Sequence, residues 1–442
     1  MSVVPACSGL PARSGLPARS GLPATADVVV IGAGMVGAAT AAALAASGRR
    51  VCVVDRAGPL GGTTAAGEGN ILVSDKVPGP ELALALRSLE LWRAFAAEAG
   101  AIAESGPIEF EPKGGLVVAH DEQQLAALRE LGARQAAAGV TVQPLDAGAL
   151  REAEPRLSAD LAGGALYPQD GQVQPMRAAL AYLARARRHG AVVVAGAAAI
   201  ALETTPGSAG GQGEADGPGG RVSALVTSRG RISTPVVVNA CGPWSGDVAR
   251  RLGSALPVWP RRGRILVTEP LPAVIRHKVY EADYVSAVVS DAGRLQCSAV
   301  VEGTASGTVL IGSSRDAAGF SSRPDPAALA EMARRAISLL PFLAEVRAIR
   351  AYAGFRPASP DHLPIIGADP AVPGLFHATG HEGAGIGLAP ATAELITALI
   401  TAFTAGTAPP VDAASFGPAR FAAGAAGPGD VPQLSAWRAD QS

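Results

Sequence analysis

The feature that most constrains the fold is a glycine motif set between a strand and a helix near the start of the chain. The stretch DVVVIGAG begins at Asp27 and is apolar and β-branched up to its glycines, which indicates a buried parallel strand. The alanine-rich stretch at residues 35–48 is typical of a helix that ends at a glycine, and RRVCVVD after it indicates a second strand. The segment therefore predicts a compact β–α–β unit.

The glycines of this unit predict a dinucleotide site. Gly32 permits a tight turn, Gly34 lets a pyrophosphate approach the backbone, and Gly37 allows close packing of helix on sheet. The helix N-terminus offers free N–H groups and partial positive charge to the phosphates. Asp55 ends the second strand, 18 residues beyond Gly37, where a carboxylate accepts ribose hydroxyls. A purely structural glycine turn is the alternative, and the strand–turn–helix–strand–acid context argues against it.

A second glycine-rich stretch, GGTTAAGEGN at residues 61–70, bears on whether the ligand is NAD or FAD. The hydroxyls of Thr63 and Thr64, together with the glycines, suit an extended pyrophosphate and a flavin ring. A nicotinamide enzyme has no particular need for such a stretch. An ordinary polar loop explains the same residues equally well, so spacing alone leaves both interpretations open.

Composition narrows the class of protein and its partners. With 442 residues, 48% of them hydrophobic and 17% charged, the chain is long and apolar enough for two or three globular domains. The formal net charge of −1 and the lack of a long basic run argue against nucleic acid as a partner. The most apolar stretch, residues 388–405, is interrupted by Pro390 and Glu394, and so predicts a core helix rather than a membrane span.

The cysteines point to a reduced, cytoplasmic protein. They are scattered and form neither a CxxC pair nor a metal-ligand spacing, so we expect no metal site. The four are Cys7, Cys52, Cys241 and Cys297.

The order of the predicted elements indicates an α/β fold with an α+β second domain. We expect a Rossmann-like nucleotide-binding domain, discontinuous in sequence, with an inserted antiparallel-sheet domain. The nucleotide-binding domain is predicted at residues 26–105, 168–256 and 351–405, and the inserted domain at 106–167 and 257–350. The resemblance described below implies that the first binds FAD and that the second binds the substrate. A disordered leader with SGLPAR repeats is predicted at residues 1–25, and a loose tail at 406–442. Further helices are predicted at residues 81–99, 123–138, 176–189 and 327–340, and loop with short strand at 352–385.

Five stretches occur here in the order seen in a known family. They are VVVIGAGMVGAATAAALA, GGTTAAGEGN, VVVNACGPWS, AGFRPASPDHLPIIG and LFHATGHEGAGIGLAPATAELI. The chain resembles the FAD-dependent amine and amino-acid oxidoreductases of the D-amino-acid oxidase, glycine oxidase and sarcosine oxidase type. It looks most like the flavoprotein subunits of D-hydroxyproline dehydrogenase, opine oxidase and hydrogen cyanide synthase, which carry a similar GHEGAGIG. The resemblance covers roughly residues 26–421.

The resemblance implies FAD as the cofactor, bound noncovalently because no cysteine lies where one branch of the family tethers the ring. Asp55 takes the place of the usual glutamate, Ala199 stands where valine often meets the adenine, and Cys241 replaces a usual alanine. The residues implied to contact FAD are Gly32, Ala33, Gly34, Met35, Val36, Gly37, Asp55, Arg56, Thr63, Thr64, Gly69, Asn70, Ala199, Ala240, Gly242, Gly380, Gly383, Gly385, Ile386 and Gly387.

Three residues are implied at the catalytic centre. Arg356 matches the arginine that clamps the substrate carboxylate, and a planar guanidinium suits that role through two parallel hydrogen bonds. His381 either acts on the substrate amine, since its ordinary pKa is near neutrality, or bonds a backbone carbonyl beside the flavin. Glu382 orders the loop, binds the amine or faces the flavin edge.

A second donor to the substrate carboxylate has three tyrosine candidates. For each of them plain packing is the alternative. They are Tyr280, Tyr284 and Tyr352.

The implied activity is oxidation of the C–N bond of a small amino or imino acid, by hydride transfer from the α-carbon to flavin N5. Candidate substrates are D-amino acids, D-hydroxyproline or proline-like acids, glycine and sarcosine. The acceptor is oxygen, giving peroxide, or a partner iron–sulfur or second flavoprotein subunit, or a quinone. Two other functions stay open: a flavin-binding subunit with a structural role, and a nicotinamide-dependent enzyme. In the glycine run GHEGAGIG, backbone N–H groups are expected to meet the flavin, helped by the dipole of the helix that follows.

Overall fold

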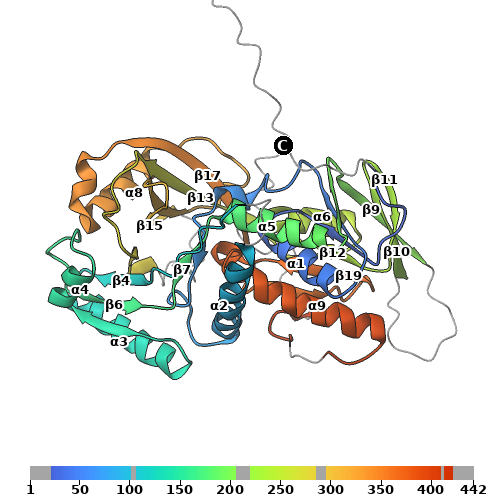
Figure 1. The fold of residues 1–442 in the computed structure, drawn as a ribbon, viewed down its shortest axis with the longest axis horizontal. Coiled ribbons are helices and arrows are strands. Elements are labelled where there is room, and N and C mark those ends of the chain that lie inside the picture. Colours follow the sequence, from blue (N-terminus) through green and yellow to red (C-terminus); the bar gives the residue numbers. More distant parts are fainter. Residues whose placement is uncertain (1–20, 101–105, 206–219, 285–294, 410–412, 422–442) are drawn as a thin grey trace, which may run out of the picture.

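The computed structural model describes residues 21–100, 106–205, 220–284, 295–409 and 413–421. Figure 1 shows two sheet systems side by side, with the helix α2 (Pro80–Ala99) between them. Most of the predicted leader and tail lies outside the described residues. Of the leader, Ala24 accepts a hydrogen bond from Ser233 N and Thr25 bridges the same residue, so its end packs on the protein.

The first system is a six-stranded sheet built around the predicted β–α–β unit. Five strands run parallel and the edge strand β18 is antiparallel to its neighbour. In spatial order the strands are β18 (Ile365–Ala368), β19 (Leu375–Thr379), β12 (Val237–Asn239), β1 (Val28–Ile31), β2 (Val51–Asp55) and β8 (Val192–Ala195).

Both faces of this sheet are covered, which explains why β1 is apolar at every position. Val28 and Val30 face a cluster formed with helices, whereas Val29 and Ile31 face the other side. The helices α1 (Met35–Ala46), α5 (Pro175–Arg188) and α9 (Ala389–Ala405) pack together on the first face (Figure 1). A three-stranded antiparallel sheet covers the second face, made of β9 (Ala199–Thr205), β10 (Arg221–Thr227) and β11 (Gly230–Ser233).

The second system is an eight-stranded sheet that is antiparallel except for the pair β4 and β14. In spatial order its strands are β17 (Ala348–Ala358), β13 (Trp259–Thr268), β16 (Val309–Arg315), β15 (Gln296–Gly303), β14 (Lys278–Glu281), β4 (Gly115–Ala119), β6 (Gly163–Tyr167) and β5 (Gln143–Asp146). Its helices are α3 (Glu122–Ala137), α4 (Ala147–Ala153) and α8 (Pro326–Leu339).

The other elements of the described residues are short. They are β3 (Asn70–Ile71) paired with β7 (Gly171–Gln172), the helix α6 (Ser245–Arg251), and the 3₁₀ turns η1 (Thr63–Ala66), η2 (Gly242–Trp244), η3 (Pro341–Glu345), η4 (Glu382–Ala384) and η5 (Pro418–Phe421).

The predicted α/β class with an antiparallel second sheet is confirmed, while one local prediction is wrong. Residues 352–385 were expected to be loop and short strand, but β17 is an eleven-residue strand paired along its length with β13. Gly354 and Pro357 resemble loop signals, yet the glycine is needed because Ala66 of η1 lies against it. The domain boundaries themselves stay a prediction. Among the helices of the described residues, none has the length and apolar character that crossing a bilayer requires.

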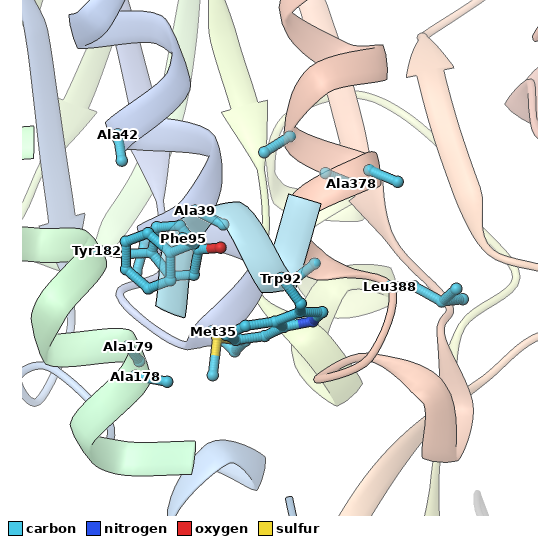
Figure 2. Packing of buried hydrophobic residues seen from close by; sticks show 14 of the residues in the cluster. Met35, Ala39, Ala42, Trp92, Phe95, Ala178, Ala179, Tyr182, Ala378 and Leu388 are labelled. Atoms are coloured by element: carbon cyan, nitrogen blue, oxygen red, sulfur yellow. The ribbon is translucent and has the colours of Figure 1, made fainter. Parts of the chain in front are cut away.

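An aromatic cluster links α2 to the glycine run at residues 380–387. Trp92, Phe95 and Tyr182 pack together, with Phe95 and Tyr182 stacked at a centroid distance of 3.7 Å (Figure 2). The indole Nε1 of Trp92 donates to the carbonyl oxygens of Ile386 at 3.2 Å and Gly387 at 2.9 Å. The glycine run is therefore held by hydrogen bonds from a helix that lies far away in sequence.

We expect Trp92→Phe to lower the free energy of unfolding by about 1–3 kcal/mol, because the carbonyls of Ile386 and Gly387 lose the indole N–H as a donor. Denaturant unfolding of the purified protein measures the change. Tyr182→Phe is the matched control, since it removes a hydroxyl from the same cluster without breaking a hydrogen bond to the glycine run. Equal loss in both variants would contradict the role of the indole N–H.

Candidate active site

A cavity of about 320 Å³ lies where the six-stranded sheet meets β13 and β17. Its walls come mainly from three distant parts of the chain: the glycine motif and residues 61–70, the segment around η2, and β17 with the glycine run. Residues 197–199, β13 and Tyr284 complete them. The cavity therefore brings together the sequence stretches that resembled one family.

The glycine motif has the close contacts that its spacing predicts. Gly32 has a φ of +105°, and a side chain there would press on the carbonyl of Ala240 at the end of β12. A Cβ on Gly37 would overlap the carbonyl oxygen of Gly32. The turn can thus follow the strand closely only with glycine at both positions, which leaves the N-terminus of α1 open to the cavity.

Asp55 and Thr64 fasten the loops around this turn. Asp55 Oδ2 accepts from Ala33 N at 2.9 Å, and its Oδ1 accepts from two backbone N–H groups just after β2. Thr64 Oγ1 accepts from Met35 N at 2.9 Å, and Thr63 Oγ1 donates to the carbonyl of Phe355 on β17 at 2.5 Å. The two threonines therefore connect α1 to the second sheet across the cavity floor.

Most residues predicted to contact the cofactor line this cavity. Those that do are Gly32, Gly34, Met35, Val36, Asp55, Arg56, Thr63, Thr64, Gly69, Asn70, Ala199, Ala240, Gly242, Gly383, Gly385 and Ile386. Four others lie behind the wall: Ala33, Gly37, Gly380 and Gly387.

The glycine run is crowded mainly by the protein itself. Gly380 has a φ of +75° and lies against Ile365, and a Cβ on Gly387 would be 3.1 Å from the carbonyl oxygen of Asn70. A Cβ on Gly385 would be 3.3 Å from the Cβ of His381. Gly383 is different, because a Cβ there would meet only the Arg356 side chain at 3.7 Å, on the cavity side. Gly383 is thus the member of the run whose missing side chain leaves space in the cavity.

Arg356 lies at the cavity end of β17. Its Nη1 donates to the carbonyl of Ser314 at 2.8 Å, and no carboxylate of the described residues is within 4 Å of its guanidinium. Burial, and then the positive charge of Arg315, lower the pKa of Arg356 to about 10, so it remains charged at neutral pH. A buried cation without a carboxylate partner suits an anionic ligand.

His381 and Glu382 are held by protein groups on all sides. The Nε2 of His381 lies 2.9 Å from Thr392 Oγ1 on α9, and burial lowers the pKa of this histidine to about 3. Glu382, with an unusual φ of +44°, lies between Arg261 Nη1 at 3.5 Å and His362 Nδ1 at 2.9 Å. His381 is therefore neutral in the structure, and Glu382 is engaged in an ion pair with Arg261.

The three tyrosine candidates separate. Tyr284 lines the cavity, with the Arg315 guanidinium 4.7 Å above its ring. Tyr280 is buried and donates to Asp170 at 3.1 Å, which is a packing role. Tyr352 is half-buried on β17 and is not among the residues that line the described cavity.

Sequence reasoning missed several cavity residues. Gly263 on β13 lies against the Arg356 guanidinium, where any side chain would overlap it. Trp244 stacks under the Arg56 guanidinium at 4.4 Å and on Phe320 at 5.1 Å. Glu68 lines the cavity next to Asn70, within the very stretch that drew attention for its threonines. The sequence signal that could have identified Glu68 is its charge within the glycine-rich stretch at residues 61–70.

The residues present fit an FAD. The glycine turn and the N-terminus of α1 can hold the pyrophosphate, and the extended cavity continues past Thr63 and Thr64 toward Arg356. The Oδ1 of Asn70, a cavity residue, is buried without a hydrogen-bond partner in the described structure, as expected for a group that completes its bonding with a ligand.

Comparison with known proteins gives the same assignment. The sequence profile of the family described as DAO, FAD dependent oxidoreductase, matches residues 27–399. Glycine oxidase of Geobacillus kaustophilus is 30% identical over 382 residues, which span 85% of this chain and 92% of that protein. Its crystal structure superposes with a TM-score of 0.76 at 25% identity, covering 89% of this chain and 98% of that one.

Two Pseudomonas aeruginosa proteins extend the comparison. Hydrogen cyanide synthase subunit HcnC is 27% identical over 436 residues, or 90% of this chain and 96% of the relative. Glycine oxidase is 34% identical over 201 residues, so this chain spans 50% of that relative's length.

We expect Gly37→Ala to abolish stable FAD binding, because the added methyl overlaps the Gly32 carbonyl and forces the glycine turn off the strand. The FAD content of the purified variant, read from its visible absorption, measures the loss. Gly61→Ala is the control: it also adds a methyl at the cavity, but at ordinary contact distance of 3.6 Å from its nearest neighbour. Full FAD content in Gly37→Ala would disprove the assignment.

Proposed function

The chain belongs to the DAO family of FAD-dependent oxidoreductases, and from this premise we propose that it oxidises the C–N bond of a small amino or imino acid. Bound FAD, held noncovalently, supplies the acceptor for a hydride from the substrate α-carbon. The similarity to glycine oxidases supports an amino-acid substrate. The observation that carries the proposal is the Arg356 guanidinium, charged and without a carboxylate partner in the described part of the cavity.

Arg356 is proposed to bind the substrate carboxylate and so fix the α-carbon. Its position is well determined, because Ser314 accepts one of its N–H groups and Gly263 provides a flat backbone surface beneath it. This contact contributes orientation: it holds the substrate α-carbon in a reactive position next to the flavin. Tyr284, on the cavity wall under Arg315, is placed to add a hydroxyl donor.

His381 and Glu382 are proposed to hold the glycine run rather than to transfer protons. His381 is bonded to Thr392 and stays neutral, and Glu382 is paired with Arg261 and His362. Both groups are already committed to protein partners. They fix the loop that carries Gly383 at the cavity wall.

The electron acceptor separates two versions of this function. The similarity to glycine oxidases supports oxygen, whereas the similarity to hydrogen cyanide synthase subunit HcnC supports a partner subunit, such as an iron–sulfur or second flavoprotein. Anaerobic reduction of the bound FAD by a panel of D-amino acids, D-hydroxyproline, proline, sarcosine and glycine tests the common proposal. Peroxide release in air then distinguishes the two acceptors, and a protein that no substrate reduces has a structural role instead.

We expect Arg356→Ala to raise KM for a carboxylate substrate by about 10- to 100-fold, the value of a charge-assisted hydrogen-bond pair. FAD content should stay unchanged. Steady-state kinetics measure the effect, with Arg350→Ala as the control because Arg350 lies on the exposed part of the same strand. An unchanged KM in Arg356→Ala would overturn the assignment.

We expect His381→Gln to leave the pH dependence of FAD reduction in place, since a histidine with a pKa of about 3 does not titrate near neutral pH. The acid limb is the low-pH part of the profile, where the rate of FAD reduction rises with pH. At pH values above this limb, the rate in the variant should fall by less than about 10-fold, because only a loop hydrogen bond is altered. Anaerobic stopped-flow measurements over a pH series check this. Loss of the acid limb in the variant would identify His381 as the proton acceptor.

A further inference from the structure

A chain of buried charges begins at the cavity wall and ends near the surface. Glu68 lines the cavity, Lys278 on β14 is fully buried, and Glu302 on the neighbouring strand β15 is 1% exposed. Lys278 Nζ makes a direct ion pair with Glu302 and lies 3.9 Å from Glu68 Oε2. We call these three residues the proton cluster.

Glu68 is placed by specific contacts. Asn70 Nδ2 donates to its Oε2 at 3.0 Å, and its Oε1 is buried without a hydrogen-bond partner in the described structure. Gly312 on β16 makes room for this oxygen, because a Cβ at that position would overlap it. Arg356 and Tyr352 on β17 also interact electrostatically with Glu68. The carboxylate and the arginine proposed to bind the substrate thus share one part of the cavity.

The cluster continues toward solvent through Lys113 and Glu111. Lys113 favours the ionised form of Glu302 electrostatically, and its Nζ donates to the carbonyl of Gly303, the next residue along β15. Lys113 also pairs with Glu111 at 2.8 Å, and the Glu111 side chain is 31% exposed. Charged side chains therefore extend from the cavity to the half-exposed carboxylate of Glu111.

Charge balance makes this cluster a proton acceptor. Two buried carboxylates share one ammonium, so full ionisation leaves an excess negative charge in a dry environment. Burial raises the pKa of Glu302 to about 7, although Lys278 opposes the shift. Burial alone would lower the pKa of Lys278, but Glu302 and Glu68 raise it above its ordinary value. Lys278 therefore stays charged, and Glu302 binds or releases one proton near neutral pH.

We propose that Glu68 accepts the proton of the substrate nitrogen, and that Lys278 and Glu302 tune the proton affinity of this carboxylate. The proposal rests on the proposed function, since a protonated amine must lose a proton before its C–N bond can be oxidised. In the step, an N–H bond of the cationic substrate breaks and an O–H bond of Glu68 forms. The electron pair of the N–H bond stays on nitrogen, and a lone pair of the carboxylate forms the O–H bond. No atom changes oxidation state, and both Glu68 and the amine become neutral.

Variants of the two tuning residues should move the acid limb of FAD reduction in opposite directions. Glu302→Gln removes a negative charge next to Lys278, so the limb should move to lower pH by about one unit or more. Lys278→Met leaves the two carboxylates without a cation, so the limb should move to higher pH by a similar amount. Glu68→Gln removes the acceptor and should slow reduction by about 100-fold or more.

Anaerobic stopped-flow reduction of the FAD-loaded enzyme over a pH series measures these limbs. The limb from the substrate's own amine should stay in place throughout. Glu281→Gln is the matched control, because Glu281 is another buried glutamate of β14 but pairs with His120 and Arg335 instead. Limbs that stay fixed, that move in the same direction, or that move equally in the control would overturn the proposal.

Infrared spectroscopy of the FAD-loaded enzyme without substrate provides a second readout. A protonated carboxyl band should titrate near neutral pH in the wild-type enzyme and in Glu281→Gln, and should be lost in Glu302→Gln. Absence of such a band in the wild-type enzyme would overturn the proposal even if Lys278→Met fails to fold. If the band titrates but no amine reduces the FAD, the proposed function is wrong. The transfer of a substrate proton to Glu68 is then wrong as well, whereas proton binding by the cluster is still supported.

Discussion

The structure depends on close approach of backbone segments that lie far apart in the sequence. The glycine turn at Gly32 presses on the end of β12, Gly69 lies against the carbonyl of Val173, and Gly387 packs on β3. A Cβ would overlap a backbone carbonyl at Gly32 and Gly69 and would be crowded at Gly387, so these contacts favour residues without a side chain. The glycine run looks like an unfavourable helix start, but most of its glycines serve these protein contacts, and only Gly383 leaves room on the cavity side.

The charges of the cavity complement a zwitterionic substrate. Arg356 offers an unpaired cation, and Glu68 offers a carboxylate with one unpartnered oxygen. Of the other charged groups nearby, Arg261 pairs with Glu382, and Asp316 accepts from Arg262 and Arg264 on the far face of β13. Arg315 lies over the ring of Tyr284. Since most buried charges are paired, the few that are not mark the place where a ligand with a carboxylate and an amine would bind.

The sequence predicted those parts of the structure that depend on residues close together in the chain. The β–α–β unit follows from an apolar run, three glycines and an alanine-rich helix, and resemblance carried the assignment to Arg356. β17 was not predicted, because glycine and proline at positions 354 and 357 are typical of loops. Gly354 is instead required by a contact with Ala66, which lies 288 residues earlier in the chain. The proton cluster was equally hidden. Residues 68, 278 and 302 meet only through the pairing of β14 with β15 and the packing of both against the loop after η1.

The two sheets contribute to the cavity in different ways: one supplies backbone contacts at the cofactor site, and the other supplies side chains at the proposed substrate site. The six-stranded sheet supplies the glycine turn and Asp55, whose geometry tolerates little change because backbone atoms are in contact. The eight-stranded sheet supplies Arg356, Lys278 and Glu302 as side chains on paired strands. A side chain on a strand can be exchanged without moving the backbone beneath it. On the proposed function, we therefore expect the preference for one amine over another to depend on the second sheet, acting on a cofactor placed by the first.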